Sequence, residues 1–163
     1  MELVSFASQG TMLMQLTFAM FLGLVLGMER SIAGKSAGMR TYALVALGSC
    51  LFVIISGYVS AANFNYFTFD PLRVTAGIIT GVGFLGAGLI ILRESHLRGL
   101  TTAAGLWVAA GIGVATGFKL YLLAFFTTVL TLVVFTIMWF AEEKVKSASN
   151  EDEKVPPESP LSN

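Results

Sequence analysis

Charged residues are scarce in this sequence of 163 residues. Asp, Glu, Lys and Arg together make up 12% of it, whereas a soluble globular domain carries about 25%. The net charge is zero, so no overall basic field points to nucleic acid as a partner. The single cysteine, Cys50, excludes an internal disulfide and a cluster of thiolate metal ligands, and the single histidine, His96, adds little to the stock of metal ligands.

Long apolar runs take the place of the missing charge. Hydrophobic residues make up 55% of the sequence, and its mean hydropathy is +0.78. The runs cover residues 11–28, 41–62, 74–92, 102–118 and 120–141. As a helix at ~1.5 Å per residue, the uncharged third run is about 28 Å long, close to the ~30 Å hydrocarbon core of a bilayer. The sequence therefore predicts an all-α membrane protein, a bundle of about five transmembrane helices in contact with the lipid bilayer.

The basic residues between the runs predict the orientation of the chain. If five runs cross the membrane, eight of the 10 Lys and Arg residues lie on one side, namely Arg30, Lys35, Arg40, Arg93, Arg98, Lys144, Lys146 and Lys154. Arg73 and Lys119 lie on the other side. Basic residues are enriched in cytoplasmic loops. We therefore expect the N-terminus outside and the C-terminus in the cytoplasm.

One transmembrane domain is expected over residues 1–141. No Lys or Arg precedes the first run, and the run ends in "GMER" rather than in a small-residue cleavage pattern, so it does not resemble a cleaved signal peptide. Residues 142–163 are charged, contain proline and have almost no large apolar side chains. This composition predicts a disordered cytoplasmic tail.

Glycine is concentrated in the third and fourth runs. The stretch "GVGFLGAG", residues 81–88, matches the dinucleotide-binding pattern G-x-G-x-x-G, but it lies inside an unbroken apolar run, and no acidic residue follows about 20 positions later. Small residues instead let transmembrane helices approach closely. The third run has two small faces on a helix, which predicts that it is central together with the fourth, whereas the bulky fifth run faces lipid. The expected helix-packing residues are Gly23, Gly27, Gly77, Gly81, Gly83, Gly86, Gly88, Gly105, Ala109 and Gly113.

The motif "DPLR" stands at the start of the third run. Asp70 suits a helix N-cap, Pro71 suits the first helical position, and Arg73 is three residues from Asp70. Helix capping is therefore one interpretation of this motif. The alternative is that Asp70 handles cations at the outer face of the membrane.

Glu29 stands at the C-terminal end of the first run, where a helix dipole disfavours a carboxylate. It therefore needs a cation, and we expect Arg40 rather than the adjacent Arg30, which projects about 100° away on a helix. One interpretation is a simple ion pair at the membrane edge. The other is a polar cluster of Glu29 with Arg40, Arg98 and Thr101 at the inner mouth of the bundle.

Catalysis has little support in the residues. The sequence shows no Ser–His–Asp order, no paired carboxylates and no metal-ligand spacing, and Cys50 lies in an apolar run where a thiolate is disfavoured. We expect neither enzymatic activity nor a cofactor. In the segment before the fourth run, Gly99 can end the preceding element, and Thr101 or Thr102 can cap the helix that follows.

Four ordered motifs resemble the MgtC/SapB family of bacterial inner-membrane proteins: "GLVLGMER", "AGMRTYALVALGSCLF", "DPLRVTAGIITGVGFLGAGLII" and "RGLTTAAGLWVAAGIGVATG". The resemblance covers about residues 20–120 and implies about five spans with an external N-terminus. Longer family members carry a cytoplasmic C-terminal domain, so the shorter SapB-like branch is the closer comparison. The polar functional candidates at motif positions are Glu29, Arg30, Arg40, Thr41, Asp70, Arg73, Arg98, Thr101 and Trp107, and Gly38 and Gly99 are further motif positions.

The family is associated with magnesium homeostasis and survival in low magnesium, and two functional hypotheses follow. In the first, the chain supports magnesium homeostasis without catalysis, by contacting other membrane proteins through its small-residue faces. In the second, it transports magnesium, alone or as a homo-oligomer, along backbone carbonyls and threonines. Magnesium would then be a ligand or substrate, and the candidate metal ligands are Glu29 and Asp70.

Overall fold

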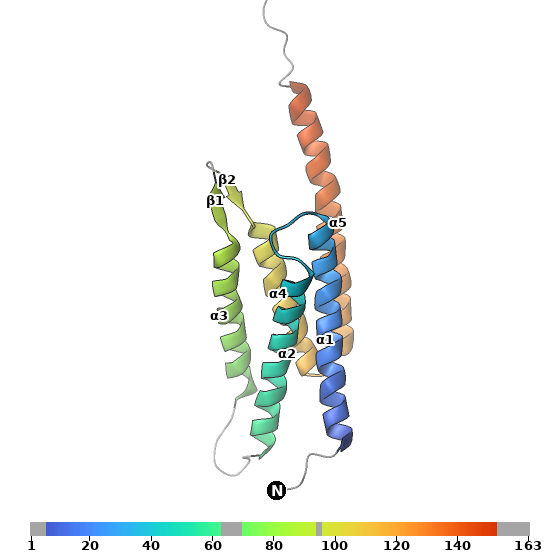
Figure 1. The fold of residues 1–163 in the computed structure, drawn as a ribbon, viewed down its shortest axis with the longest axis vertical. Helices are drawn as coiled ribbons and strands as arrows, with labels where there is room; N and C mark the ends of the chain where they lie inside the picture. Colours follow the sequence, from blue (N-terminus) through green and yellow to red (C-terminus); the bar gives the residue numbers. More distant parts are fainter. Residues whose placement is uncertain (1–5, 63–69, 94–95, 153–163) are drawn as a thin grey trace, which may run out of the picture. The chain divides into compact units, whose positions relative to one another are not determined.

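The computed structural model describes residues 6–62, 70–93 and 96–152. Five helices make up most of this part of the chain: α1 (Phe6–Ile32), α2 (Met39–Ala62), α3 (Pro71–Leu89), α4 (Leu100–Gly117) and α5 (Tyr121–Asp152). Two short antiparallel strands, β1 (Ile91–Arg93) and β2 (His96–Arg98), lie between α3 and α4 (Figure 1). Helices α1 to α4 are each long and apolar enough to cross a membrane. The predicted all-α membrane bundle is therefore confirmed.

Helix α5 extends across two compact units of the chain, which divide between Leu132 and Val133. Its described apolar segment, Tyr121–Ile137, is shorter than the spans of the other four helices. Because α5 continues to Asp152, residues 142–152 are helical where their composition predicted disorder. Ala, Glu and Lys are good helix formers, and extending a helix needs no new nucleus. The rest of the predicted tail, residues 153–163, lies outside the described residues.

Helix α4 is the centre of the bundle, as its small residues predict. It contacts α1, α2 and α3, and half of its residues are buried. Gly105, Ala109 and Gly113 are all among them. A Cβ added at Gly113 would overlap the carbonyl oxygen of Ala46 on α2. Glycine at 113 therefore sets how closely α2 and α4 approach.

Helix α3, by contrast, lies at the edge of the bundle (Figure 1). It contacts α4 and α2, and 11% of its residues are buried. Among the described residues, a Cβ added at Gly77, Gly81, Gly83 or Gly88 would meet no atom within 4 Å, and Gly86 alone of the α3 glycines packs against a neighbour. The predicted central position of the third run is therefore wrong within this chain. Small residues permit close approach on every face where they occur, but they do not select which face is used.

The small residues of α1 do lie at a close contact with α2. A Cβ added at Gly23 would lie 2.6 Å from the carbonyl oxygen of Tyr42, and one at Gly27 would lie 2.5 Å from the Cα of Met39. Both distances are too short for a side-chain carbon. The spacing of four residues between these glycines places them on one face of α1, and this face receives the backbone of α2.

The starts of α3 and α4 show how local sequence sets helix boundaries. The Asp70 carboxylate accepts a hydrogen bond of 2.9 Å from the backbone N–H of Leu72, and Pro71 is the first helical residue, as capping predicts. Gly99 precedes α4 with φ of 90° and no side-chain cap, so the expected cap by Thr101 or Thr102 is wrong. A Cβ at Gly99 would also overlap the carbonyl oxygen of Leu89. Glycine is thus required there for both conformation and space.

The turn from α4 to α5 is closed by backbone hydrogen bonds. The N–H of Leu120 donates to the carbonyl of Ala115 at 2.8 Å, and that of Lys119 donates to Thr116 at 2.9 Å. Lys119 has φ of 64°, so these bonds form a Schellman motif with lysine at the left-handed position. Gln15 of α1 adds two bonds from its side-chain Nε2, to the carbonyls of Thr116 at 3.0 Å and Gly117 at 2.8 Å. The end of α4 therefore keeps its carbonyls paired, which an apolar membrane demands.

Candidate functional site

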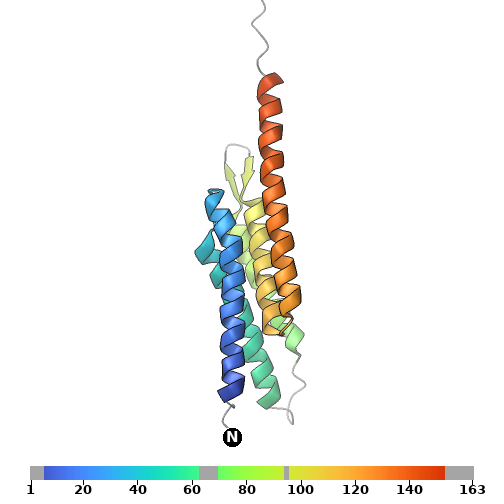
Figure 2. The same ribbon diagram turned by 90° about the vertical axis from the view of Figure 1, so that its right-hand side faces the viewer.

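The β1–β2 pair and the α1–α2 loop, residues 33–38, lie at one end of the bundle, and the α4–α5 turn lies at the other (Figures 1 and 2). Most of the predicted polar residues belong to the first of these ends. These residues lie near the end of α1 and the starts of α2 and α4, and Tyr42 of α2 contacts Thr102 of α4 there. This end is therefore the candidate functional site.

Glu29 and Arg30 form an ion pair near the end of α1. The Nη2 of Arg30 donates to Oε1 of Glu29 at 2.7 Å, and its Nε donates to Oε2. The Arg30 side chain is 3% exposed and that of Glu29 is 21% exposed. Two charge-assisted hydrogen bonds in a fixed fork are stronger and more directional than a single contact. The pair therefore holds a charge-neutral group at the edge of the apolar bundle.

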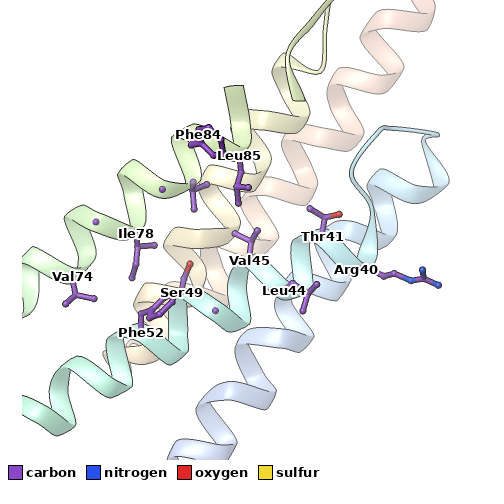
Figure 3. A pocket seen from close by; sticks show the side chains of 14 residues that line it. Arg40, Thr41, Leu44, Val45, Ser49, Phe52, Val74, Ile78, Phe84 and Leu85 are labelled. Carbon is purple, nitrogen blue, oxygen red and sulfur yellow. The ribbon is translucent and has the colours of Figure 1, made fainter. Parts of the chain in front are cut away.

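The expected partner of Glu29, Arg40, does not make this contact. Arg40 lies in the first turn of α2 with an exposed side chain, directed away from α3 (Figure 3). Adjacent residues on a helix project about 100° apart, but the long side chain of Arg30 spans this difference. The four rotatable bonds of the Arg30 side chain let its guanidinium group reach the carboxylate of Glu29, whereas the side chain of Arg40 points outward from α2. The prediction of a Glu29–Arg40 pair is wrong.

Tyr42 ties α2 to α4 beside this ion pair. Its ring is fully buried, and its hydroxyl donates a hydrogen bond of 3.1 Å to the backbone carbonyl of Thr102. Because the carbonyl of Tyr42 itself lies against Gly23, this one residue contacts both α1 and α4. We call Glu29, Arg30, Tyr42 and Thr102 the three-helix cluster, since they come from α1, α2 and α4.

The α1–α2 loop is held by a side chain of α1. The hydroxyl of Ser31 accepts a hydrogen bond of 3.2 Å from the backbone N–H of Met39 at the start of α2. A Cβ added at Gly38 would overlap this same oxygen, so the family motif position Gly38 needs glycine for space. Ala37, a residue of the loop itself, is buried. The loop is thus packed onto the bundle rather than extended from it.

Several predicted polar residues lie apart from the three-helix cluster. Thr41 and Thr101 are exposed, and Trp107 on α4 is 53% exposed. Arg98 belongs to β2, and its side chain lies outside the described part of the structure. The proposed cluster of Glu29 with Arg40 and Thr101 is therefore not assembled.

The two candidate metal ligands lie at opposite ends of the bundle. Glu29 pairs with Arg30, and Asp70 caps α3 beside the exposed Arg73. Among the described residues, no three His, Cys, Asp or Glu side chains come together as a metal site. Both carboxylates thus already have partners within the protein.

Sequence reasoning missed Gln15 and the role of Tyr42. Gln15 is 2% exposed and caps α4 from within α1. An amide inside an otherwise apolar run is a signal that could have identified it, because buried polar groups in a membrane need partners. Nothing in the spacing of Tyr42 distinguishes it from its apolar neighbours, since its partner is a backbone carbonyl 60 residues away.

A groove of about 860 Å³ lies between α2 and α3 (Figure 3). Its walls are mostly aliphatic and aromatic, from Leu44 and Phe52 on α2 to Ile78 and Leu85 on α3. Gly48, Gly77 and Gly81 also line it, so three small residues widen the space between the helices. Arg40 and Thr41 lie at the end of the groove nearest the three-helix cluster.

Comparison with known proteins shows the family. Residues 16–144 match the model of the MgtC family. "Putative magnesium transporter YhiD" of Escherichia coli (strain K12) is 41% identical over 114 residues, which are 69% of this chain and 53% of that protein. "Protein SapB" of Bacillus subtilis (strain 168) is 38% identical over 137 residues, 80% of this chain and 58% of that protein. "Protein SrpB" of Synechococcus elongatus is 37% identical over 177 residues, 95% of each chain.

The chain is a multi-pass membrane protein, and it belongs to the MgtC family. It spans about half the length of YhiD (53%) and somewhat more of SapB (58%). No solved structure matches it.

Proposed function

We propose that this chain supports magnesium homeostasis in the bacterial inner membrane by binding another membrane protein, without transporting the ion and without catalysis. The observation that carries the proposal is the edge position of α3. Its small residues, which suit close helix packing, are left uncovered by the rest of the chain.

The surface proposed for the partner consists of Ala76, Thr80, Gly83 and Ala87, which we call the α3 outer face. All four residues are exposed, and their spacing of four, three and four residues places them along one side of a helix. The Thr80 hydroxyl is already bonded to the carbonyl of Ala76 at 2.9 Å. In lipid, helices associate where small residues let their backbones approach. A transmembrane helix of a partner protein, or of a second copy of this chain, fits this face.

The link to magnesium comes from the family. YhiD, which is 41% identical to this chain, is named as a putative magnesium transporter. Because this chain covers 53% of YhiD, the role in magnesium homeostasis is proposed here for the shared membrane domain.

Transport of magnesium is the second candidate, favoured by the name of YhiD. A transport path would need oxygen ligands for the ion. Glu29 and Asp70 lie at opposite ends of the bundle with partners already in place. This arrangement supports the first candidate over transport.

Growth in low magnesium tests the partner surface. In a strain that depends on this gene, Gly83→Leu should impair growth at unchanged membrane abundance, because the larger side chain blocks close approach at the α3 outer face. The matched control is Gly111→Leu on α4, another exposed glycine with open space around it. Equal growth of both variants would show that the α3 outer face does not bind the partner.

Reconstituted vesicles containing a magnesium-sensitive dye separate the two candidates directly. We expect the purified chain to add no magnesium flux over empty vesicles. Flux that depends on the protein and is lost in Asp70→Asn would overturn the proposal and establish transport.

The proposed orientation places the three-helix cluster on the cytoplasmic side. In a Cys50→Ser background, a cysteine replacing the exposed Lys119 should react with an impermeant thiol reagent in intact cells, and one replacing the exposed Lys35 should not. The reverse pattern would invert the topology.

A further inference from the structure

The α2–α3 groove is open on one side and is lined mostly by apolar side chains, so it favours an apolar ligand over water. Residues 40 and 52 line it at opposite ends along α2, and at ~1.5 Å per residue they are about 18 Å apart. One leaflet of a bilayer contributes about 15 Å, half of the ~30 Å hydrocarbon core. Along α2 the groove therefore has about the length of one leaflet, from Arg40 at its charged end to Phe52 near the middle of the helix.

We infer that this groove binds an acyl chain of an anionic phospholipid whose phosphate group is held by Arg40, whose exposed side chain turns toward the groove from the outward direction seen in Figure 3. The guanidinium group matches phosphate geometry with paired hydrogen bonds. Arg40 also lies in the first turn of α2, where the helix dipole favours an anion. The Thr41 hydroxyl at the same end of the groove can donate a further hydrogen bond to a phosphate oxygen.

The shape of the groove favours a flexible chain over a helix. Phe84 on its rim is 81% exposed, and Phe52 is also exposed, so bulky side chains project where the backbone of a second helix would have to approach. The small residues Gly48, Gly77 and Gly81 instead widen the space between these walls. A helix is about 10 Å wide with its side chains, whereas an acyl chain can follow a narrow, uneven channel. A volume of about 860 Å³ is within the ~300–1,000 Å³ range of ligand sites.

The proposed orientation, which rests on the charge asymmetry of the loops, places Arg40 at the cytoplasmic leaflet, where anionic lipids are enriched and basic pockets between helices bind their headgroups. Thus the charged end of the groove and the expected position of anionic headgroups coincide. This inference concerns a lipid site on α2 and α3, and it is independent of the partner proposed for the α3 outer face.

Quenching by brominated lipids tests the inference on the purified full chain in phosphatidylcholine vesicles. The reporter is Phe52→Trp in a chain that carries Trp107→Phe and Trp139→Phe. Dibrominated phosphatidylglycerol and dibrominated phosphatidylcholine are compared at equal low mole fraction. At ~1 kcal/mol per basic residue, we expect about fivefold preference for phosphatidylglycerol. A control reporter at the exposed Leu123→Trp on α5, outside the groove, should show no preference.

Variants in the groove, each with a matched control outside it, test whether the preference for phosphatidylglycerol arises in the groove. Arg40→Gln should bring the ratio of the two association constants close to one, while Lys35→Gln, which removes an exposed cation in the neighbouring loop, should leave it unchanged. Gly81→Leu should reduce quenching by both lipids because it fills the groove, and Gly111→Leu should not. If Phe52→Trp does not fold, Leu44→Trp places the reporter on the same wall.

Three results would overturn the inference. The first is equal association constants for the two brominated lipids at the groove reporter. The second is an equal loss of preference in Arg40→Gln and Lys35→Gln, which would show a diffuse surface charge. The third is protection of the groove reporter from both lipids together with cross-linking between copies through Gly81→Cys, which would identify a second copy of the chain as the occupant.

Discussion

The hydroxyl of Tyr42 on α2 donates a hydrogen bond of 3.1 Å to the backbone carbonyl of Thr102 on α4, and both residues are buried. This bond joins the two helices at the end of the bundle where Glu29 and Arg30 pair on α1. The three-helix cluster is therefore held by two side chains. Arg30 of α1 binds the carboxylate of Glu29, and Tyr42 of α2 binds the carbonyl of Thr102.

Tyr42→Phe should lower the free energy of unfolding by about 1 kcal/mol, since it removes one buried hydrogen bond and little volume. Thermal unfolding of the purified protein in detergent measures this. Tyr58→Phe is the matched control on the same helix, and because Tyr58 is exposed its effect should remain within about 0.5 kcal/mol. Equal effects would mean that the Tyr42 bond contributes nothing measurable.

Arg30→Gln should be much more damaging than Arg40→Gln. Removing Arg30 leaves the largely buried Glu29 carboxylate without its charged partner, which costs about 3 kcal/mol. Arg40 is exposed, so its loss should change the free energy of unfolding by less than about 0.5 kcal/mol.

A double-mutant cycle isolates the Glu29–Arg30 interaction. The variant with both Glu29→Gln and Arg30→Gln should be more stable than the sum of the single changes predicts, by at least about 1 kcal/mol. Additive effects would exclude a coupled pair.

Gly113→Ala and Gly81→Ala should have different effects on the free energy of unfolding. Gly113→Ala forces a Cβ into the carbonyl of Ala46 and should destabilise the protein by about 1–3 kcal/mol. Gly81→Ala adds a Cβ in open space and should be neutral, or stabilising by up to about 1 kcal/mol, because alanine favours a helix over glycine. Thermal unfolding of both variants checks this. A greater loss of stability in Gly81→Ala than in Gly113→Ala would indicate that α3 is packed at the centre of the bundle.

Gln15→Leu should destabilise the protein by about 1–3 kcal/mol, because the carbonyls of Thr116 and Gly117 lose their side-chain donor in an apolar environment. Gln9→Leu, at an exposed position of the same helix, provides the control. Amide hydrogen exchange should also show faster exchange in the last turn of α4 in the Gln15 variant. Unchanged exchange and stability would rule out this capping role.

The helices and several of their ends could be predicted from local sequence. Long apolar runs need a bilayer, and a helix in a bilayer needs no partner to satisfy its backbone, so α1 to α4 follow from composition alone. The cap at Asp70 is also local, since donor and acceptor are two residues apart. Gly105, Ala109 and Gly113 of α4 are buried, and Gly23 and Gly27 of α1 lie against α2, because small residues are necessary where helices approach closely.

The choice among faces and partners was decided by the tertiary structure. Small residues on α3 predicted packing, but the neighbours cover the side that carries Gly86 and leave Gly81 and Gly83 open. Glu29 required a cation, yet the sequence offered two, and the direction in which α2 begins turned Arg40 outward and left Arg30 to form the pair. Sequence by itself determined that this protein is a helical membrane protein of the MgtC family, because hydropathy and ordered motifs are local properties. Only the tertiary structure decided which polar groups meet and which small face stays open, because those relations depend on the relative positions of segments far apart in the chain.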